Sequence, residues 1–184
     1  MKTNLIQEYD AVNSRVRFYV KLYLLLCLVA GLLLFAGYNI GFRLNRSPST
    51  PRGLWLLQPN MPVGVGNFVA VPPGANPGYA LALERGYFRE GAIMLKIIIA
   101  AEGDLVDYDH EEKAVTVNGR HIPATEIFPY DSQGRPLYPA SFPVVLGSNQ
   151  VWLSSEWERG FDSRYFGPVY SETLTKAVPV WVFR

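Results

Sequence analysis

An uninterrupted apolar run near the N-terminus constrains this 184-residue chain more than any other feature. Residues 22–38 carry no charged side chain and are mostly Leu, Val, Ala and Gly. With residues 39–42 the run reaches about twenty residues, the length of a helix that crosses the hydrocarbon core of a bilayer. It is apolar on every side, and it is too long and too far from the start for a cleaved signal peptide. We predict a transmembrane helix over residues 22–42.

The charges around this run favour an N-terminus inside the cell. Lys2, Arg15, Arg17 and Lys21 precede the run, and Arg43, Arg46 and Arg52 follow it. A short, basic N-terminal segment tends to stay in the cytoplasm. We therefore expect a single-pass protein of the cytoplasmic (inner) membrane, with residues 1–21 as a cytoplasmic segment and residues 43–184 as a catalytic domain in the periplasm.

Composition excludes several kinds of protein. The formal net charge is only +1. The chain therefore lacks the excess of positive charge that would indicate a nucleic-acid partner. The single cysteine, Cys27, lies in the apolar run, and no intrachain disulfide can form. His110 and His121 are the only histidines and sit among polar residues, which is too few for a histidine-rich metal site. We expect no metal ion and no cofactor.

From residue 43 onward, short apolar runs alternate with proline and glycine, which is typical of β structure. The runs that predict strands are 53–57, 67–71, 92–100, 114–117, 151–154 and 178–183. Asn118-Gly119, between two such short runs, predicts a type I′ hairpin. Gly134 and the prolines that follow it mark a long irregular connection. We predict a mainly β, mostly antiparallel domain without a long amphipathic helix.

One lysine lies inside the most apolar of these predicted strands. Lys96 follows Ile93-Met94-Leu95 and precedes three isoleucines, and strand alternation puts Met94 and Ile98 on its face. If that face is covered, burial lowers the lysine pKa, and the neutral amine can then act as a base. If the strand is half-exposed, Lys96 points to water. The pattern alone leaves both readings open.

A serine lies in a proline-flanked turn soon after the apolar run. Ser49 sits between Pro48 and Thr50-Pro51, with Gly53 beyond. The proline rings fix the backbone and the glycine permits an unusual turn, which suits a presented nucleophile. A serine hydroxyl needs a base within hydrogen-bond reach, and a neutral lysine can serve. The stretch is also consistent with a simple linker.

Three segments carry recognisable motifs: residues 45–55 (NRSPSTPRGLW), residues 92–106 (AIMLKIIIAAEGDLV) and residues 161–169 (FDSRYFGPV). Taken together and in this order, they resemble the nucleophile box, the lysine box and the final box of bacterial type I signal peptidases, and most closely those of the conjugative-transfer (TraF-like) branch of that family. From the first box to the last, the resemblance spans nearly the whole body. The resemblance implies a signal-peptidase-like antiparallel β catalytic domain behind one N-terminal transmembrane helix.

The resemblance also implies roles for individual residues. By position, Ser49 is the nucleophile and Lys96 the general base, and the Ser47 hydroxyl and the Ser49 backbone N–H form the oxyanion hole. The support motif near the lysine is Asp162, Ser163 and Arg164. Substrate would bind as an added strand, and its contacts are Asn45, Pro48, Ala92 and Met94. We expect Asp162 and Arg164 to form an ion pair shielded by neighbouring aromatic residues.

The chain departs from the family pattern at three positions. The family usually has arginine after the lysine and proline before the Gly-Asp turn, where this chain has Ile97 and Glu102. Type I signal peptidases also carry a serine two residues before the final-box aspartate, where it hydrogen-bonds the lysine amine. That position is Gly160 here. The candidates to replace it are Ser154, Ser155 and Ser163.

The function implied by the resemblance is that of a membrane-anchored serine endopeptidase with a Ser/Lys dyad. It would cut a secreted or membrane-inserted precursor after small residues, and in the TraF branch a conjugative pilin precursor, in some systems joining the pilin ends. The implied partners are the precursor, membrane lipid and conjugative transfer machinery. Two alternatives remain: a general type I signal peptidase, and an inactive structural component of the transfer apparatus, against which the presence of both Ser49 and Lys96 argues.

Overall fold

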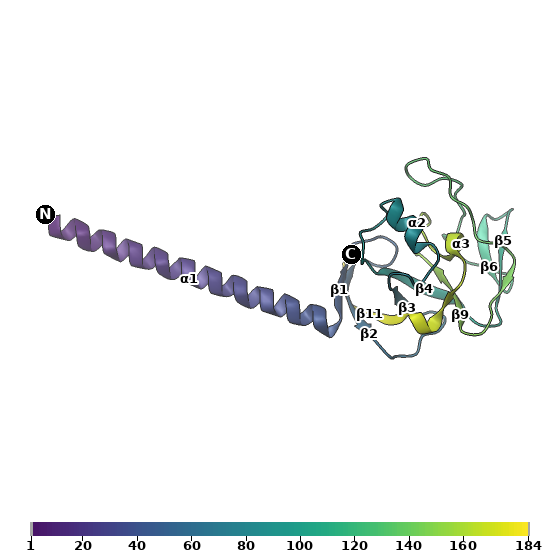
Figure 1. Cartoon of the computed structure of the whole chain (residues 1–184), viewed down its shortest axis with the longest axis horizontal. Coiled ribbons are helices and arrows are strands. Elements are labelled where there is room, and N and C mark those ends of the chain that lie inside the picture. The colour runs from purple at the N-terminus through teal and green to yellow at the C-terminus, as the bar shows by residue number, and fades with distance from the viewer. Residues whose placement is uncertain (1, 184) are drawn as a thin grey trace. The chain divides into compact units, whose positions relative to one another are not determined.

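The computed structural model describes residues 2–183 as two compact units that divide between Phe42 and Arg43. The N-terminal unit is one helix, α1 (Lys2–Ile40), drawn in purple in Figure 1. Within it, Arg15–Ile40 is a 26-residue stretch that contains an 18-residue window of mean hydropathy 2.3, none of which is buried in the protein, and the stretch is long and apolar enough to cross a membrane. The helix begins well before residue 22, because residues 2–21 contain no glycine or proline that would end it. It ends at Ile40, two residues before the predicted end, because Gly41 has a positive φ of 108° and Phe42 begins the first strand.

The second unit is built on a seven-stranded sheet (Figure 1) whose order is β1-β2-β11-β3-β4-β9-β10. Its strands are β1 (Phe42–Asn45), β2 (Gly53–Gln58), β3 (Phe68–Val71), β4 (Met94–Ala100), β9 (Gln150–Ser154), β10 (Val169–Tyr170) and β11 (Thr175–Val182). The pairings from β2 through to β10 are antiparallel. The predicted mainly antiparallel β fold is therefore confirmed.

A smaller four-stranded sheet of order β7-β6-β5-β8 lies beside the first. It consists of β5 (Leu105–Asp109), β6 (Ala114–Val117), β7 (Arg120–His121) and β8 (Val144–Val145). The predicted hairpin joins β6 to β7. Asn118 and Gly119 have φ of 51° and 78°, the positive values that a type I′ turn requires, so this prediction is confirmed.

Helices in this unit are short, as predicted. They are α2 (Tyr79–Glu84), α3 (Ser163–Phe166) and a 3₁₀ turn, η1 (Ser171–Thr173). The predicted irregular connection runs from residue 122 to residue 143. All residues of this segment are described, and the only β pairing among them is a single bridge between Tyr130 and Pro136.

The strand that carries Lys96, β4, contributes side chains to all three core clusters of the domain. Ile98 of β4 belongs to a core cluster with Val69 and Leu153. Ala100 packs in a second cluster, with Val106 and Trp152, that joins the two sheets. Leu95 packs with Trp55, Ala70 and Ala177 in a third cluster. Because both faces of β4 contact core side chains, its backbone is a rigid support for any group it presents.

Candidate active site

The turn that carries Ser49 is organised by one amide side chain. Asn45, at the end of β1, is only 9% exposed. Its Nδ2 lies 2.9–3.1 Å from oxygens of Ser47, Thr50 and Pro51, and its Oδ1 accepts from the Ser47 N–H at 3.0 Å. The Asn45 amide is thus engaged with the turn itself, so only its backbone remains for the substrate contact that the sequence suggested.

Ser49 lies at the surface of this turn, half-buried. Its Oγ is 2.9 Å from Ser47 Oγ, and its backbone N–H donates to the same Ser47 Oγ at 3.2 Å. The two predicted oxyanion donors therefore lie beside the predicted nucleophile, where they are bonded to one another. The Ser49 carbonyl accepts from the Glu156 N–H at 2.9 Å, which ties the turn to the segment after β9.

Lys96 is buried, with 2% of its surface exposed. Its Nζ donates to Ser155 Oγ at 2.6 Å. Burial is the main cause that lowers the Lys96 pKa from 10.5 to about 8, while Asp162 raises it and Arg164 lowers it. Of the two readings of this strand, the covered one is confirmed and the half-exposed one is wrong.

Of the three candidate serines, Ser155 is the one whose hydroxyl contacts the Lys96 amine. Ser154 Oγ donates to the Ser155 carbonyl at 3.3 Å. Ser163 Oγ accepts from the Leu153 N–H at 3.0 Å. Both are buried but bond elsewhere, so of the three candidates only Ser155 contacts the Lys96 amine. No spacing in the sequence singles it out, because Ser155 and Lys96 are brought together by the pairing of β9 with β4.

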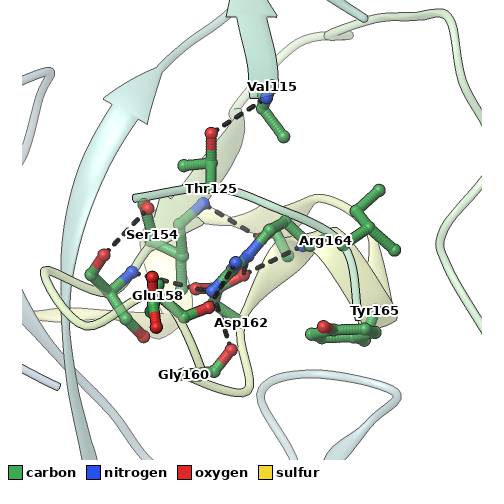
Figure 2. Close-up of polar contacts among 12 residues, drawn as sticks. Val115, Thr125, Ser154, Glu158, Gly160, Asp162, Arg164 and Tyr165 are labelled. Carbon is green, nitrogen blue, oxygen red and sulfur yellow. Dashed lines mark hydrogen bonds and ion pairs between the residues drawn. The ribbon is translucent and has the colours of Figure 1, made fainter. Parts of the chain in front are cut away.

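The support motif forms a fully buried ion pair, as predicted. Arg164 Nε donates to Asp162 Oδ1 and Arg164 Nη2 to Asp162 Oδ2, both at 2.8 Å, and neither side chain is exposed. Figure 2 shows the Arg164 guanidinium against the Asp162 carboxylate. The geometry comes from a helix cap rather than a strand, because Asp162 caps α3 by accepting from the Arg164 N–H.

This ion pair also holds the backbone at Ser155, the partner of Lys96, and in the segment that leads to Gly160. Asp162 Oδ2 accepts from the Ser155 N–H at 3.0 Å. Arg164 Nη2 donates to the Gly160 carbonyl at 2.8 Å, and Nη1 donates to the carbonyls of Glu126 and Glu158. Such charge-assisted bonds are stronger than neutral ones. Asp162 and Arg164 therefore fix where the Ser155 and Gly160 backbones stand.

A cavity of about 470 Å³ brings the predicted residues together. Ser47, Ser49 and Lys96 line it, as do the predicted substrate contacts Asn45, Pro48 and Met94. Ala92 is not among its lining residues, and neither are Asp162, Ser163 and Arg164, which are fully buried. The arrangement places a serine hydroxyl and a lysine amine of lowered pKa at one cavity, which is the set of groups that nucleophilic catalysis without histidine requires.

One part of the cavity wall was not anticipated from the sequence. Tyr87, after α2, and Asp131, from the irregular connection, line it. The Tyr87 hydroxyl donates to Asp131 Oδ2 at 2.7 Å, and Arg135 Nε donates to the same oxygen at 2.7 Å. Burial raises the Asp131 pKa, but the bonds from Tyr87 and Arg135 outweigh it and lower the pKa overall. Irregular segments show no periodic signal, so this wall could not be predicted.

One edge of β4 is open beside Lys96. Pairing with β3 continues as far as Met94, but pairing with β9 ends at Ile97. On the β9 side, the backbone from Met94 to Lys96 thus has no strand partner within residues 2–183. An open strand edge of this kind can receive an extended peptide.

Comparison with known proteins identifies the family. The family described as signal peptidase, peptidase S26, matches residues 15–182. A conjugal transfer protein TraF of Agrobacterium tumefaciens is 38% identical over 152 residues, which are 78% of this chain and 84% of the relative. A plasmid transfer protein TraF of Escherichia coli is 36% identical over 158 residues, 81% of this chain and 88% of the relative. The chain belongs to the signal peptidase (peptidase S26) family and, within it, to the conjugative-transfer branch of TraF proteins.

Proposed function

We propose that this protein is a membrane-anchored serine endopeptidase in which Ser49 is the nucleophile and Lys96 the general base. The observation that carries the proposal is the buried lysine, whose pKa is lowered to about 8, at the same cavity as the Ser49 hydroxyl. A lysine with its ordinary pKa would be protonated near neutral pH and could not take a proton. Lowering it leaves a useful fraction of neutral amine.

In the proposed reaction, Ser49 Oγ attacks the scissile carbonyl carbon while the neutral Lys96 amine takes the hydroxyl proton. The resulting ammonium then gives this proton to the leaving amine, and the C–N bond breaks to leave an acyl-enzyme. In the structure the Ser49 hydroxyl bonds to Ser47 and the Lys96 amine to Ser155. We expect the bond between Ser49 and Lys96 to form in the substrate complex, since catalytic hydrogen bonds often tighten only then.

The Ser47 hydroxyl and the Ser49 N–H would stabilise the oxyanion of the tetrahedral intermediate. Both donors already lie beside Ser49 Oγ, bonded to one another. Substrate would replace that mutual bond with two bonds to its own oxygen. Loss of one such donor typically costs about 10²–10³ in kcat.

The substrate of the proposed reaction is a secreted or membrane-inserted precursor, bound as a strand along Met94–Lys96. The names of the relatives favour a precursor used in conjugative transfer, such as a pilin, over a general signal-peptide-bearing protein. Water attacking the acyl-enzyme would complete hydrolysis, and an amine, including the precursor's own N-terminus, would form a new peptide bond. The alternatives, a general signal peptidase and an inactive structural component, are the competing outcomes of the experiment below.

The proposed topology places residues 1–21 in the cytoplasm, residues 22–42 in the inner membrane and residues 43–184 in the periplasm. It rests on the length and hydropathy of Arg15–Ile40 and on the basic N-terminal segment. Protease added to intact spheroplasts should digest an epitope tag placed after the body and spare a tag placed at the N-terminus. Protection of the C-terminal tag would reverse the proposed orientation.

The test of the function uses full-length protein in detergent micelles with a pilin-like precursor encoded near its gene and, separately, a general secretory precursor. Wild type should cleave the pilin-like precursor, and Ser49→Ala should not. Ser148→Ala is the matched control, because Ser148 is an exposed serine that bonds to Glu102 away from the cavity. Faster cleavage of the secretory precursor would favour the general signal peptidase. A folded wild type that cleaves neither would favour the structural component.

A further inference from the structure

Ser155 and Gly160 share one small volume beside the Lys96 amine. Gly160 is buried although it has no side chain. A Cβ built on it would overlap both Cβ and Oγ of Ser155, and it would lie 3.0 Å from the Trp157 carbonyl oxygen. Gly160 does not have a positive φ, so its backbone would tolerate other residues. Position 160 therefore requires glycine because the Ser155 side chain occupies the space that a larger residue would need.

The Ser155 hydroxyl is also the only hydrogen-bond partner of Lys96 Nζ among residues 2–183. A lysine side chain has four rotatable carbon–carbon bonds, and its ammonium or amine group can point in many directions. Here the stem lies between core strands, and the head is held at one point by a 2.6 Å bond. Since small displacements of a reacting group lower rates steeply, this single contact decides where the amine stands.

We propose that Ser155 is the positioning residue of Lys96 and that glycine at position 160 leaves the space that the Ser155 side chain needs. Positions 155 and 160 would then work as an interchangeable pair. A serine at either position, with glycine at the other, would place a hydroxyl beside the lysine amine. A serine at both would overlap, and a glycine at both would leave the amine without a partner. This inference rests on the proposed function only for its kinetic readout.

The backbone of both positions is fixed independently of their side chains. The Ser155 N–H donates to Asp162 and the Gly160 carbonyl accepts from Arg164, and both bonds use main-chain atoms that every variant keeps. An exchange of side chains between the two positions therefore meets a framework that stays in place. The charged groups that act on Lys96, which are Asp162 and Arg164, also stay the same.

The experiment is an exchange cycle of Ser155→Gly, Gly160→Ser and the double variant. Each single variant should lower kcat by about 10²-fold with KM nearly unchanged. Gly160→Ser acts by forcing the Ser155 side chain away, and Ser155→Gly by removing the hydroxyl. The double variant should recover most of the loss. If the two positions acted independently, their effects would multiply and the double variant would be the slowest, which would overturn the proposal.

Two further measurements keep the result clear. Ser154→Ala, a buried neighbour that does not contact Lys96, should retain most of the wild-type rate, and thermal melting should show that each variant folds. NMR titration of ¹³C-labelled Lys96 reports the contact without activity. Ser155→Gly should lower its midpoint, because the hydroxyl stabilises the ammonium, and the double variant should restore it. If the wild-type protein cleaves the precursor no faster than Ser49→Ala does, the proposed function is refuted but the role of Ser155 is not. If the titration midpoint of Lys96 is the same in Ser155→Gly as in wild type, the role of Ser155 is refuted.

Discussion

Replacing Lys96 by methionine should stabilise the domain at neutral pH while abolishing its proposed activity. A lowered lysine pKa means that the folded state disfavours the charged form relative to the unfolded state. The penalty is full below the folded pKa of about 8, declines as pH rises above it, and is gone above the unfolded value of 10.5. Methionine fills a similar elongated volume without a charge to bury.

The size of the effect follows from the same shift. At 1.36 kcal/mol per pKa unit, a shift from 10.5 to about 8 corresponds to about 3 kcal/mol at pH 7. The variant loses the hydrogen bond to Ser155, a cost of about 1 kcal/mol. The net gain is about 2 kcal/mol, which for a protein of this size raises Tm by about 4–8 °C. Above pH 10.5 only the lost bond remains, so the sign should reverse.

The assay is thermal unfolding of the detergent-solubilised protein in steps from about pH 6.5 to about pH 11, the range in which the linkage acts. Taking the difference between variant and wild type cancels the titration of every other group. Lys113→Met is the matched control, since Lys113 is exposed, and its melting should follow that of wild type. A difference between Lys96→Met and wild type that stays constant across this range would refute the coupling of burial and ionisation at Lys96.

Three further predictions concern the proposed reaction. Ser49→Ala and Lys96→Ala should each abolish turnover, and the double variant should be no slower than either, because residues acting as one unit are not additive. Lys96→Arg should also be inactive, since arginine stays protonated. Single-turnover cleavage measures the activity of all four variants. Phe or Leu in place of the small residue just before the cut should block cleavage, and undiminished product on gels would rule out a small-residue pocket. Asn45→Ala should lower kcat, because the Ser47–Pro51 turn loses its central partner; wild-type kinetics would make this amide dispensable.

Strands that alternate or are continuously apolar could be predicted from sequence, and those defined only by their partners could not. The predicted strand at 92–100 corresponds to β4 (Met94–Ala100), and 114–117 matches β6 at both ends. β5 was missed because two of its five residues are aspartates, Asp107 and Asp109. β8 and β10 contain two residues each, and such short strands exist only through pairing with a neighbour.

The candidate site divides in the same physical way. The ion pair between Asp162 and Arg164 joins residues two apart in the chain, so the local motif indicated it. The pattern around Lys96 left its burial open, because burial depends on the strands that pack against β4. The contact of Lys96 with Ser155 joins residues 59 apart in the chain, and that of Tyr87 with Asp131 joins residues 44 apart. Contacts of this kind depend on how strands and loops are placed by the whole fold. The missing serine at Gly160 showed only that some other group must take that place.

The buried ion pair behind the site supports Lys96 mechanically rather than by supplying a net charge. Asp162 raises the Lys96 pKa and Arg164 lowers it, so the two effects oppose each other and burial remains the main cause of the shift. A carboxylate alone at this depth would favour the ammonium and oppose the proposed catalysis. An arginine paired with it cancels much of that field and, through its bonds to three carbonyls, fixes the loop that carries Gly160.

Asp162→Ala tests this separation of roles. Leaving the Arg164 charge uncompensated should cost about 3–5 kcal/mol of stability and should move the pH–rate midpoint of Lys96 to lower pH, since the group that raises its pKa is gone. Adding Arg164→Met should return the midpoint toward that of wild type and recover only part of the stability, because the carbonyls that Arg164 served lose their donor. Thermal melting and the pH–rate profile measure the two effects separately. Wild-type values of both in Asp162→Ala would mean that the pair neither supports the fold nor acts on the lysine.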